Sequence, residues 1–117
     1  MIRKIIPILI LLLLSVCIAD QSKSTEGNDA PTFFLTTIDG KKFFLSDELK
    51  SGNPIFLNFF ATWCKPCRDE HVYIKQFASK EGIRVIGINY KDKKSKTIKW
   101  LEEMGNPYED VLIDKKG

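Results

Sequence analysis

Two cysteines lie close together near the middle of the chain, in the segment Trp63-Cys64-Lys65-Pro66-Cys67. A thiolate attacks disulfides, whereas a free cysteine, with a pKa of about 8.5, is mostly protonated near neutrality. Pro66 is typical of the first turn of a helix, so Cys64 is expected at a helix N-terminus, where unpaired backbone N–H groups stabilise an anion. The pattern predicts a redox pair in which Cys64 is the nucleophile and Cys67, one turn further along, is the resolving cysteine. Trp63, Lys65 and Pro66 are expected to support the pair, Lys65 as a nearby cation.

The same cysteine spacing also occurs in metal sites and in passive disulfides. A structural zinc site takes about four ligands, and His71 and Cys17 are the remaining candidates. A disulfide that closes so small a loop stabilises a protein little. We therefore expect no metal, and no cofactor other than the redox-active disulfide Cys64–Cys67. A copper-delivery module that holds the metal between two thiolates stays open as an alternative.

The N-terminus has the composition of an export signal. Residues 1–4 include two basic residues, residues 5–19 are almost wholly apolar, and a polar stretch begins at Asp20. The apolar stretch is short for a membrane span, which needs about 20 residues. We interpret residues 1–19 as a signal peptide or a short membrane anchor, and Cys17 leaves lipid modification open as a third interpretation. Export would place the cysteine pair where disulfides persist.

Charge and composition narrow the range of partners only slightly. The 117-residue chain carries 18 basic and 15 acidic residues, a net charge of +3, and removal of Arg3 and Lys4 leaves 16 against 15, or +1. The basic runs are interleaved with acids, and no basic stripe with aromatic residues points to nucleic acid. Residues 20–29 are polar and are predicted to be a flexible linker, so residues 30–117 are expected to form one domain.

The remaining sequence alternates between strand and helix patterns. Strands are predicted over residues 33–38, 42–45, 54–60, 83–90 and 111–113, with a hairpin turn at Asp39-Gly40. Helices are predicted from Ser46, taken as the N-cap, and over residues 66–80 and 92–104. The expected inward faces of the two longer helices are Val72, Tyr73, Phe77 and Ala78, and Ile98, Leu101 and Met104. This order predicts a parallel sheet preceded by a β-hairpin, with the cysteine pair at the carboxyl end of a buried-type strand.

Longer stretches resemble known exported reductases. Residues 57–68 are similar to reductases of the TlpA and ResA kind. The segments that resemble the DsbE (CcmG) family, over roughly residues 30–117, are Cys67-Arg68-Asp69-Glu70-His71, residues 82–92, Trp100-Leu101 and Gly105-Asn106-Pro107-Tyr108. The resemblance implies an α/β thioredoxin-like fold with three α/β/α layers and an N-terminal β-hairpin.

The resemblance also implies a function. Members of this family work in cytochrome c maturation, so the chain is expected to be an exported thiol–disulfide oxidoreductase that reduces apocytochrome c or its haem-ligation partner. A membrane thiol reductant would supply the electrons, and the chain would be periplasmic, either soluble or attached to the inner membrane through residues 5–19. Glu70 matches the family's acidic residue after the second cysteine, and a carboxylate there could accept a proton or raise a thiol pKa. His71 also fits the pattern, with a packing or surface role favoured over catalysis.

Two features depart from the family pattern. Thioredoxin has a buried aspartate six residues before its first cysteine, where this chain has Asn58, which does not titrate. The chain also stops at Gly117, so the fold is expected to lack the family's final strands and helix, including a strand entered through a cis-proline. A domain of about 88 residues is near the size at which burial becomes marginal. An exposed sheet edge that favours association is therefore expected.

Other functions remain open beside copper delivery. One is a general periplasmic disulfide reductase of the TlpA or ResA kind, and another is an inert truncated fragment. A peroxiredoxin is not favoured, because it would need Pro and Thr at set positions ahead of its cysteine, where this chain has Leu57 and Ala61.

Overall fold

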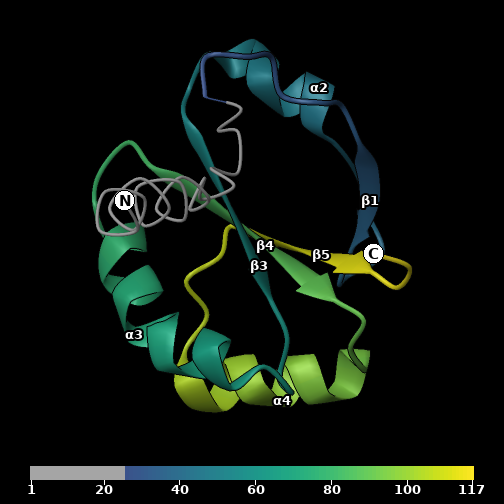
Figure 1. Cartoon of the computed structure of the whole chain (residues 1–117), viewed down its shortest axis with the longest axis vertical. Helices are drawn as coiled ribbons and strands as arrows, with labels where there is room; N and C mark the ends of the chain where they lie inside the picture. The colour runs from purple at the N-terminus through teal and green to yellow at the C-terminus, as the bar shows by residue number, and fades with distance from the viewer. Residues whose placement is uncertain (1–25) are drawn as a thin grey trace, which may run out of the picture. The chain divides into compact units, whose positions relative to one another are not determined.

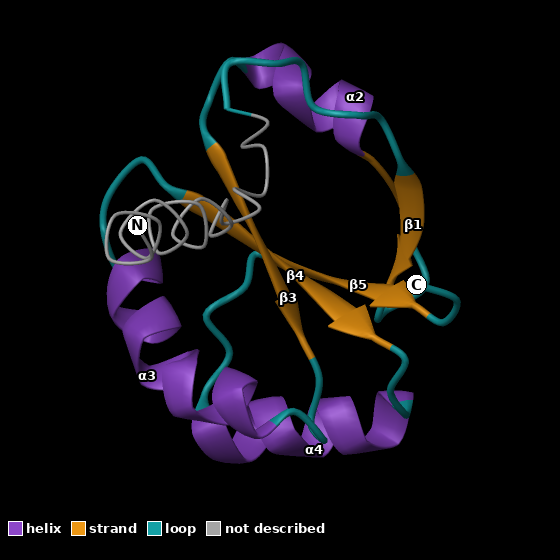
Figure 2. Cartoon of the chain, viewed as in Figure 1, coloured by secondary structure: helices purple, strands orange, loops and turns teal. Residues whose placement is uncertain are grey.

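The computed structural model describes residues 26–117, and the predicted signal or anchor, with Cys17, lies outside the described residues. Five strands alternate with two longer helices and two short helical segments (Figures 1 and 2). In chain order the elements are β1 (Phe34–Thr37), β2 (Lys42–Phe44), α2 (Leu45–Glu48), η2 (Leu49–Ser51), β3 (Ile55–Phe60), α3 (Lys65–Ala78), β4 (Arg84–Tyr90), α4 (Lys94–Met104) and β5 (Asp110–Asp114). Every predicted strand is present, with no end moved by more than one residue.

The five strands form one mixed sheet in the order β2-β1-β5-β4-β3. β3, β4 and β5 run parallel to one another, while β1 is antiparallel to both β2 and β5. The predicted hairpin closes through a hydrogen bond from Gly40 N–H to Thr37 O (2.9 Å), and Gly40 takes a φ of +92° there. Glycine suits this turn because it adopts positive φ without steric cost. The predicted hairpin and parallel sheet are confirmed.

Both longer helices pack on the same face of the sheet. Two successive right-handed crossovers in one direction place their helices on one side, and α3 and α4 lie side by side in Figure 1. The buried cluster on this side consists of Phe60, Val85, Leu101, Tyr108 and Val111. The other buried cluster takes Leu45 from α2 together with Phe43, Ile86, Ile88 and Leu112. Helical segments therefore contact both faces, in keeping with a layered α/β/α fold.

The expected N-cap of the first helix is wrong. Ser46 lies inside α2, which begins at Leu45, and Phe44 occupies the N-cap without a side-chain hydrogen bond. The Leu45 N–H donates to Phe33 O (3.1 Å) on the neighbouring strand. The chain therefore passes from β2 into α2 without the intervening residue that a serine cap would need.

The inward faces of the longer helices are also partly wrong. Val72 and Tyr73 are exposed, and the α3 residues that pack inward are Cys67, His71, Ile74, Phe77 and Ala78. On α4, Thr97 and Leu101 are buried, whereas Ile98 and Met104 are 39% and 46% exposed. Hydrophobicity alone misplaces both faces because each includes a buried polar side chain whose hydrogen-bond partner comes from elsewhere in the fold. His71 Nε2 lies 2.8 Å from Gly105 O, and Thr97 Oγ1 donates to Asn89 Oδ1 (2.9 Å).

Strand β3 stands at an edge of the sheet formed by the described residues, where it pairs with β4 alone. Its nearly continuous apolar sequence is typical of a strand covered on both sides. Phe59 is nevertheless 62% exposed, and Phe56 is 38% exposed despite its ring contact with Phe77 at 4.8 Å. Within the described residues this matches the expected exposed sheet edge, and the same strand leads directly to the cysteines.

Candidate active site

A short turn carries the chain from β3 to Cys64. Ala61, directly after the strand, is buried, and its carbonyl accepts a hydrogen bond from Cys64 N–H (3.2 Å). Cys64 has φ −89° and ψ 105°, which is extended backbone, and α3 begins at the next residue. Cys64 is therefore the N-cap of α3, as the sequence predicts.

The Cys64 sulfur occupies the position that a capping oxygen takes in other helices. Cys67 N–H points to Cys64 Sγ at 3.3 Å, and Arg68 N–H donates to Cys64 O (3.2 Å). Pro66 lies in the first turn of α3, where it leaves no donor unpaired. An N–H group and the positive end of the helix dipole thus face the sulfur, and this arrangement stabilises a thiolate.

Cys64 and Cys67 are joined by a disulfide, with their Cα atoms 5.3 Å apart. Both residues are partly buried, so the disulfide is only partly accessible to solvent. An apolar cleft of about 220 Å³ adjoins the disulfide. Its lining combines the cysteines with Phe59, Phe60, Ala61, Trp63 and Tyr90. The described state is the oxidised one, and an apolar group next to a target sulfur would fit the cleft.

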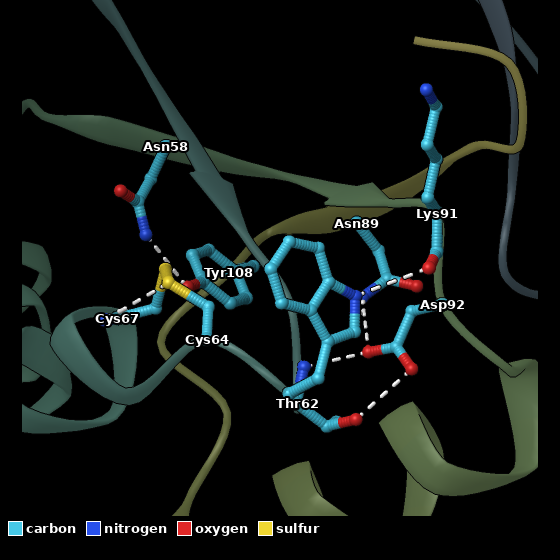
Figure 3. Close-up of a disulfide and its surroundings, with 9 residues drawn as sticks. Asn58, Thr62, Cys64, Cys67, Asn89, Lys91, Asp92 and Tyr108 are labelled. Carbon is cyan, nitrogen blue, oxygen red and sulfur yellow. Dashed lines mark hydrogen bonds between the residues drawn. A yellow bond between two sulfur atoms is a disulfide. The ribbon is translucent and has the colours of Figure 1, made fainter.

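The loop before Cys64 is held by the loop that follows β4 (Figure 3). Thr62 donates twice to Asp92, from its backbone N–H to Oδ2 (2.6 Å) and from its hydroxyl to Oδ1 (2.9 Å). Trp63 Nε1–H donates to Lys91 O (3.1 Å), although the Trp63 side chain is 62% exposed. Both residues that immediately precede Cys64 are therefore fixed by Lys91 and Asp92.

The Asp92 carboxyl is charged despite its partial burial. Burial by itself would raise the pKa of Asp92, but hydrogen bonds from Thr62, Asn89 and Lys93 outweigh burial and hold it below its ordinary value. The sequence reasoning assigned no role to Asp92. The segment Asn89-Tyr90-Lys91-Asp92 contributed to the family resemblance, and this was the sequence signal for a functional role of the loop. The contact of Asp92 with Thr62, however, is visible only in the fold.

The chain is similar to known proteins of one family. The model of the AhpC/TSA family matches residues 27–117. The thiol:disulfide interchange protein DsbE of Escherichia coli K12 is 41% identical, over 97% of this chain and 68% of its own length. The chain belongs to the DsbE proteins, within the AhpC/TSA family. The chain is accordingly a thiol–disulfide oxidoreductase, and its Cys64–Cys67 disulfide fits a Cys-x-x-Cys motif.

Further members and structures agree with the DsbE assignment. DsbE of Haemophilus influenzae is 44% identical, over 78% of this chain and 50% of its own length. A solved thiol:disulfide interchange protein of the thioredoxin family from Chlorobium tepidum TLS is 34% identical, with a TM-score of 0.56, and the match covers 73% of this chain and 59% of that one. The chain spans about half to two thirds of the length of these relatives. The predicted thioredoxin-like fold is confirmed.

The cation expected to support the DsbE cysteine pair is itself paired with an acid. Lys65 Nζ, the expected supporting cation, lies 2.8 Å from Asp69 Oδ2 and forms an exposed ion pair one turn along α3. Glu70 is exposed on α3, three residues after Cys67, and no described residue holds its carboxylate by a hydrogen bond or ion pair. Stabilisation of a Cys64 thiolate therefore depends mainly on the helix N-terminus.

An uncharged pair occupies the position at which thioredoxin has its buried acid. Asn58 Nδ2 donates to the Tyr108 hydroxyl (2.8 Å), and Figure 3 shows both residues near the disulfide. Burial raises the pKa of Tyr108 to about 12, and the hydrogen bond from Asn58 offsets this only in part. Tyr108 is therefore neutral at physiological pH.

His71, the remaining DsbE-type residue of interest, packs rather than faces the cysteines. It is buried, and its ring contacts Trp100 at 4.3 Å between centroids. Over residues 26–117, no three His, Cys, Asp or Glu side chains are grouped to hold a metal ion. Within the same residues, no helix has the length and apolar character that a membrane crossing requires.

Proposed function

We propose that this chain is an exported DsbE-type reductase that reduces disulfides of apocytochrome c, or of its haem-ligation partner, during cytochrome c maturation. The observation that carries the proposal is the 41% identity to a DsbE protein over 97% of the chain, which includes a disulfide at the start of α3. The reaction, thiol–disulfide exchange, is the one that the name of the matched DsbE protein states. The cytochrome substrate goes further and is inferred from the role of the DsbE family in cytochrome c maturation.

Cys64 is the proposed nucleophile. In the reduced chain its thiolate attacks one sulfur of the substrate disulfide, the substrate S–S bond breaks, and the other substrate sulfur leaves as a thiolate that takes up a proton. Cys67 then loses its proton and attacks the Cys64 sulfur, which breaks the mixed disulfide and releases the second substrate thiolate. Two electrons pass to the substrate, and the chain is left with the Cys64–Cys67 disulfide of the described structure.

Other residues support this exchange. Glu70 is the proposed proton acceptor for Cys67, because Asn58 cannot titrate and Glu70 is a solvent-accessible carboxylate one turn beyond Cys67. The apolar cleft lined by Phe59, Trp63 and Tyr90 would accept an apolar side chain next to the target cysteine.

The reaction needs a dithiol that reduces the pair again after each cycle. We propose a membrane thiol reductant for this role, with the chain in the periplasm, either soluble or attached to the inner membrane through residues 5–19. A reductant is required because the periplasm is kept oxidising, and the pair would otherwise remain a disulfide.

Peptide reduction tests the proposed substrate. The reduced chain is mixed with an oxidised Cys-x-x-Cys-His peptide, the sequence of c-type haem attachment, and with a matched peptide in which the histidine is moved to the other end. We expect faster reduction of the first peptide than of the second, and a trapped mixed disulfide on Cys64 in the Cys67→Ser variant. Equal rates with both peptides and with oxidised glutathione would instead favour the general TlpA- or ResA-like reductase. Failure of the Cys67→Ser variant to form any mixed disulfide would contradict both.

A further inference from the structure

The loop that holds the residues before Cys64 is itself fixed by buried polar contacts. The Asp92 carboxylate accepts hydrogen bonds from Asn89 Nδ2 (3.2 Å) and from Lys93 N–H (2.8 Å), in addition to the two from Thr62. Asn89 is 1% exposed and accepts from the hydroxyl of Thr97, which is fully buried at the start of α4. Asp92 therefore joins the end of β4, the start of α4 and the cysteine loop.

Backbone geometry next to Asp92 supports a constrained loop. Lys91 has a φ of +43° and, among the described residues, is the one non-glycine with positive φ. Such a conformation is uncommon and persists where surrounding contacts impose it. Lys91 N–H donates to Asp114 O (2.8 Å), and Lys91 O accepts from Trp63 Nε1 (3.1 Å), so both backbone polar groups of the strained residue are used.

We propose that Asp92 is a positioning residue for the redox pair: its carboxylate fixes Thr62, and through Thr62 it holds Cys64 in the N-cap position of α3. Three residues separate Cys64 from the end of β3 at Phe60, and the middle one, Thr62, donates twice to Asp92. Loss of these bonds would let the Cys64 sulfur move away from the Cys67 N–H, which lies 3.3 Å from it.

An electrostatic role and a positioning role for Asp92 predict opposite effects of Asp92→Asn on the reactivity of Cys64. A nearby carboxylate repels a thiolate, so a purely electrostatic role would make Cys64 more acidic and more reactive in Asp92→Asn. Positioning predicts the reverse, because a sulfur that leaves the helix N-terminus loses its stabilising N–H group and dipole. The sign of the change therefore distinguishes the two roles.

The experiment measures the rate of Cys64 alkylation by iodoacetamide against pH in the reduced full chain, with mass spectrometry to separate Cys64 from Cys67. We expect Asp92→Asn to lower the Cys64 rate at pH 7 by roughly fivefold or more, since a rise of one pKa unit reduces the thiolate fraction about tenfold. Asp47→Asn is the control: Asp47 Oδ1 also accepts a hydrogen bond, from Lys50 Nζ (2.7 Å), but on α2 and outside the cysteine loop. It should leave the rate unchanged.

Thr62→Val is the second variant, because it removes the hydroxyl bond to Asp92 and keeps the shape of the side chain. We expect a smaller decrease in the same direction, and circular dichroism shows whether each variant remains folded. An unchanged or faster Cys64 rate in folded Asp92→Asn, or in Thr62→Val, would overturn the inference.

The inference rests on the redox pair and not on the identity of its substrate. If Cys64 of the wild-type chain already reacts as an ordinary thiol, the redox site itself is absent and the proposed function fails with it. If wild-type Cys64 is acidic and the Asp92 variants keep that acidity, only the positioning role is refuted.

Discussion

Replacing Gly87 by alanine should distort the core directly beneath the cysteine loop. Gly87 is buried on β4, and a Cβ there would lie 2.8 Å from Phe60 Cε1 and 2.8 and 2.9 Å from two ring carbons of Tyr108. Ordinary carbon–carbon contacts are about 3.5–4.0 Å, so the rings must shift by roughly 0.7 Å or more. Neither ring is free to shift, because Phe60 is packed between Tyr108 and Trp100 and the Tyr108 hydroxyl is bonded to Asn58.

The expected loss in the free energy of unfolding follows from these contacts. Overpacking a core position costs about 1–3 kcal/mol, and two displaced aromatic rings place Gly87→Ala at the upper end. Alanine recovers about 0.4–1 kcal/mol by restricting the unfolded chain. The net destabilisation should be about 2 kcal/mol. With an m-value of about 1 kcal/mol/M, the midpoint of urea unfolding should fall by about 2 M.

Urea unfolding of the oxidised chain, followed by far-UV circular dichroism, measures this change. A second variant, Gly87→Ala with Phe60→Leu, removes one of the obstructing rings. Its destabilisation should be smaller than the sum of the two single changes by about 1 kcal/mol, because the sites are in contact. An unchanged urea midpoint in Gly87→Ala, or strict additivity in the double variant, would refute the packing argument.

Three further predictions concern stability. Burial raises the pKa of Tyr108 from 10.0 to about 12, so its contribution to stability is present below pH 10 and is lost as pH rises toward 12. The free energy of unfolding of the wild type, measured by urea titration, should fall by about 2–3 kcal/mol over that range. An equal fall in Tyr108→Phe would contradict this origin. Leu101→Ala should lower the free energy of unfolding by about 2–5 kcal/mol and Ile98→Ala by much less, because Leu101 is 6% exposed and Ile98 is 39% exposed. Equal decreases in the thermal midpoint of the two variants would show that the inward face of α4 is misassigned. Arg84 donates to Glu109 through both Nε and a terminal nitrogen, a geometry that lysine cannot reproduce. Arg84→Lys should therefore lower the free energy of unfolding by about 1 kcal/mol, and by a smaller amount in 1 M salt. A loss that does not depend on salt would argue against an electrostatic contribution.

Sequence reasoning reached the architecture because the strand signals are strong and local. The apolar runs before Cys64 and over residues 84–90 are strands, and Pro66 marks the start of α3. The position of Cys64 as N-cap was predictable for the same reason. The hydrophobic pattern of a single helix does not reveal polar residues that face the core, so the burial of Thr97 was not predicted and the packing role of His71 was only one of two expected.

The contacts that hold the cysteine loop were beyond sequence reasoning. Asp92 and Thr62 are 30 residues apart, and their meeting depends on β3 and β4 ending side by side, with Phe60 opposite Asn89. The Asn58–Tyr108 bond spans 50 residues in the same way. Sequence alone identified Asn58 as a departure from thioredoxin, but not the tyrosine hydroxyl that it meets.

The pH dependence of Cys64 alkylation in the reduced wild-type chain tests the central claim most directly. A helix N-cap that stabilises the thiolate predicts a single Cys64 titration well below the free-cysteine pKa of about 8.5, with Cys64 reacting faster than Cys67 near neutral pH. Titration of Cys64 as an ordinary thiol, with the two cysteines equally reactive, would show that the active site of a thiol–disulfide oxidoreductase is not assembled in this chain.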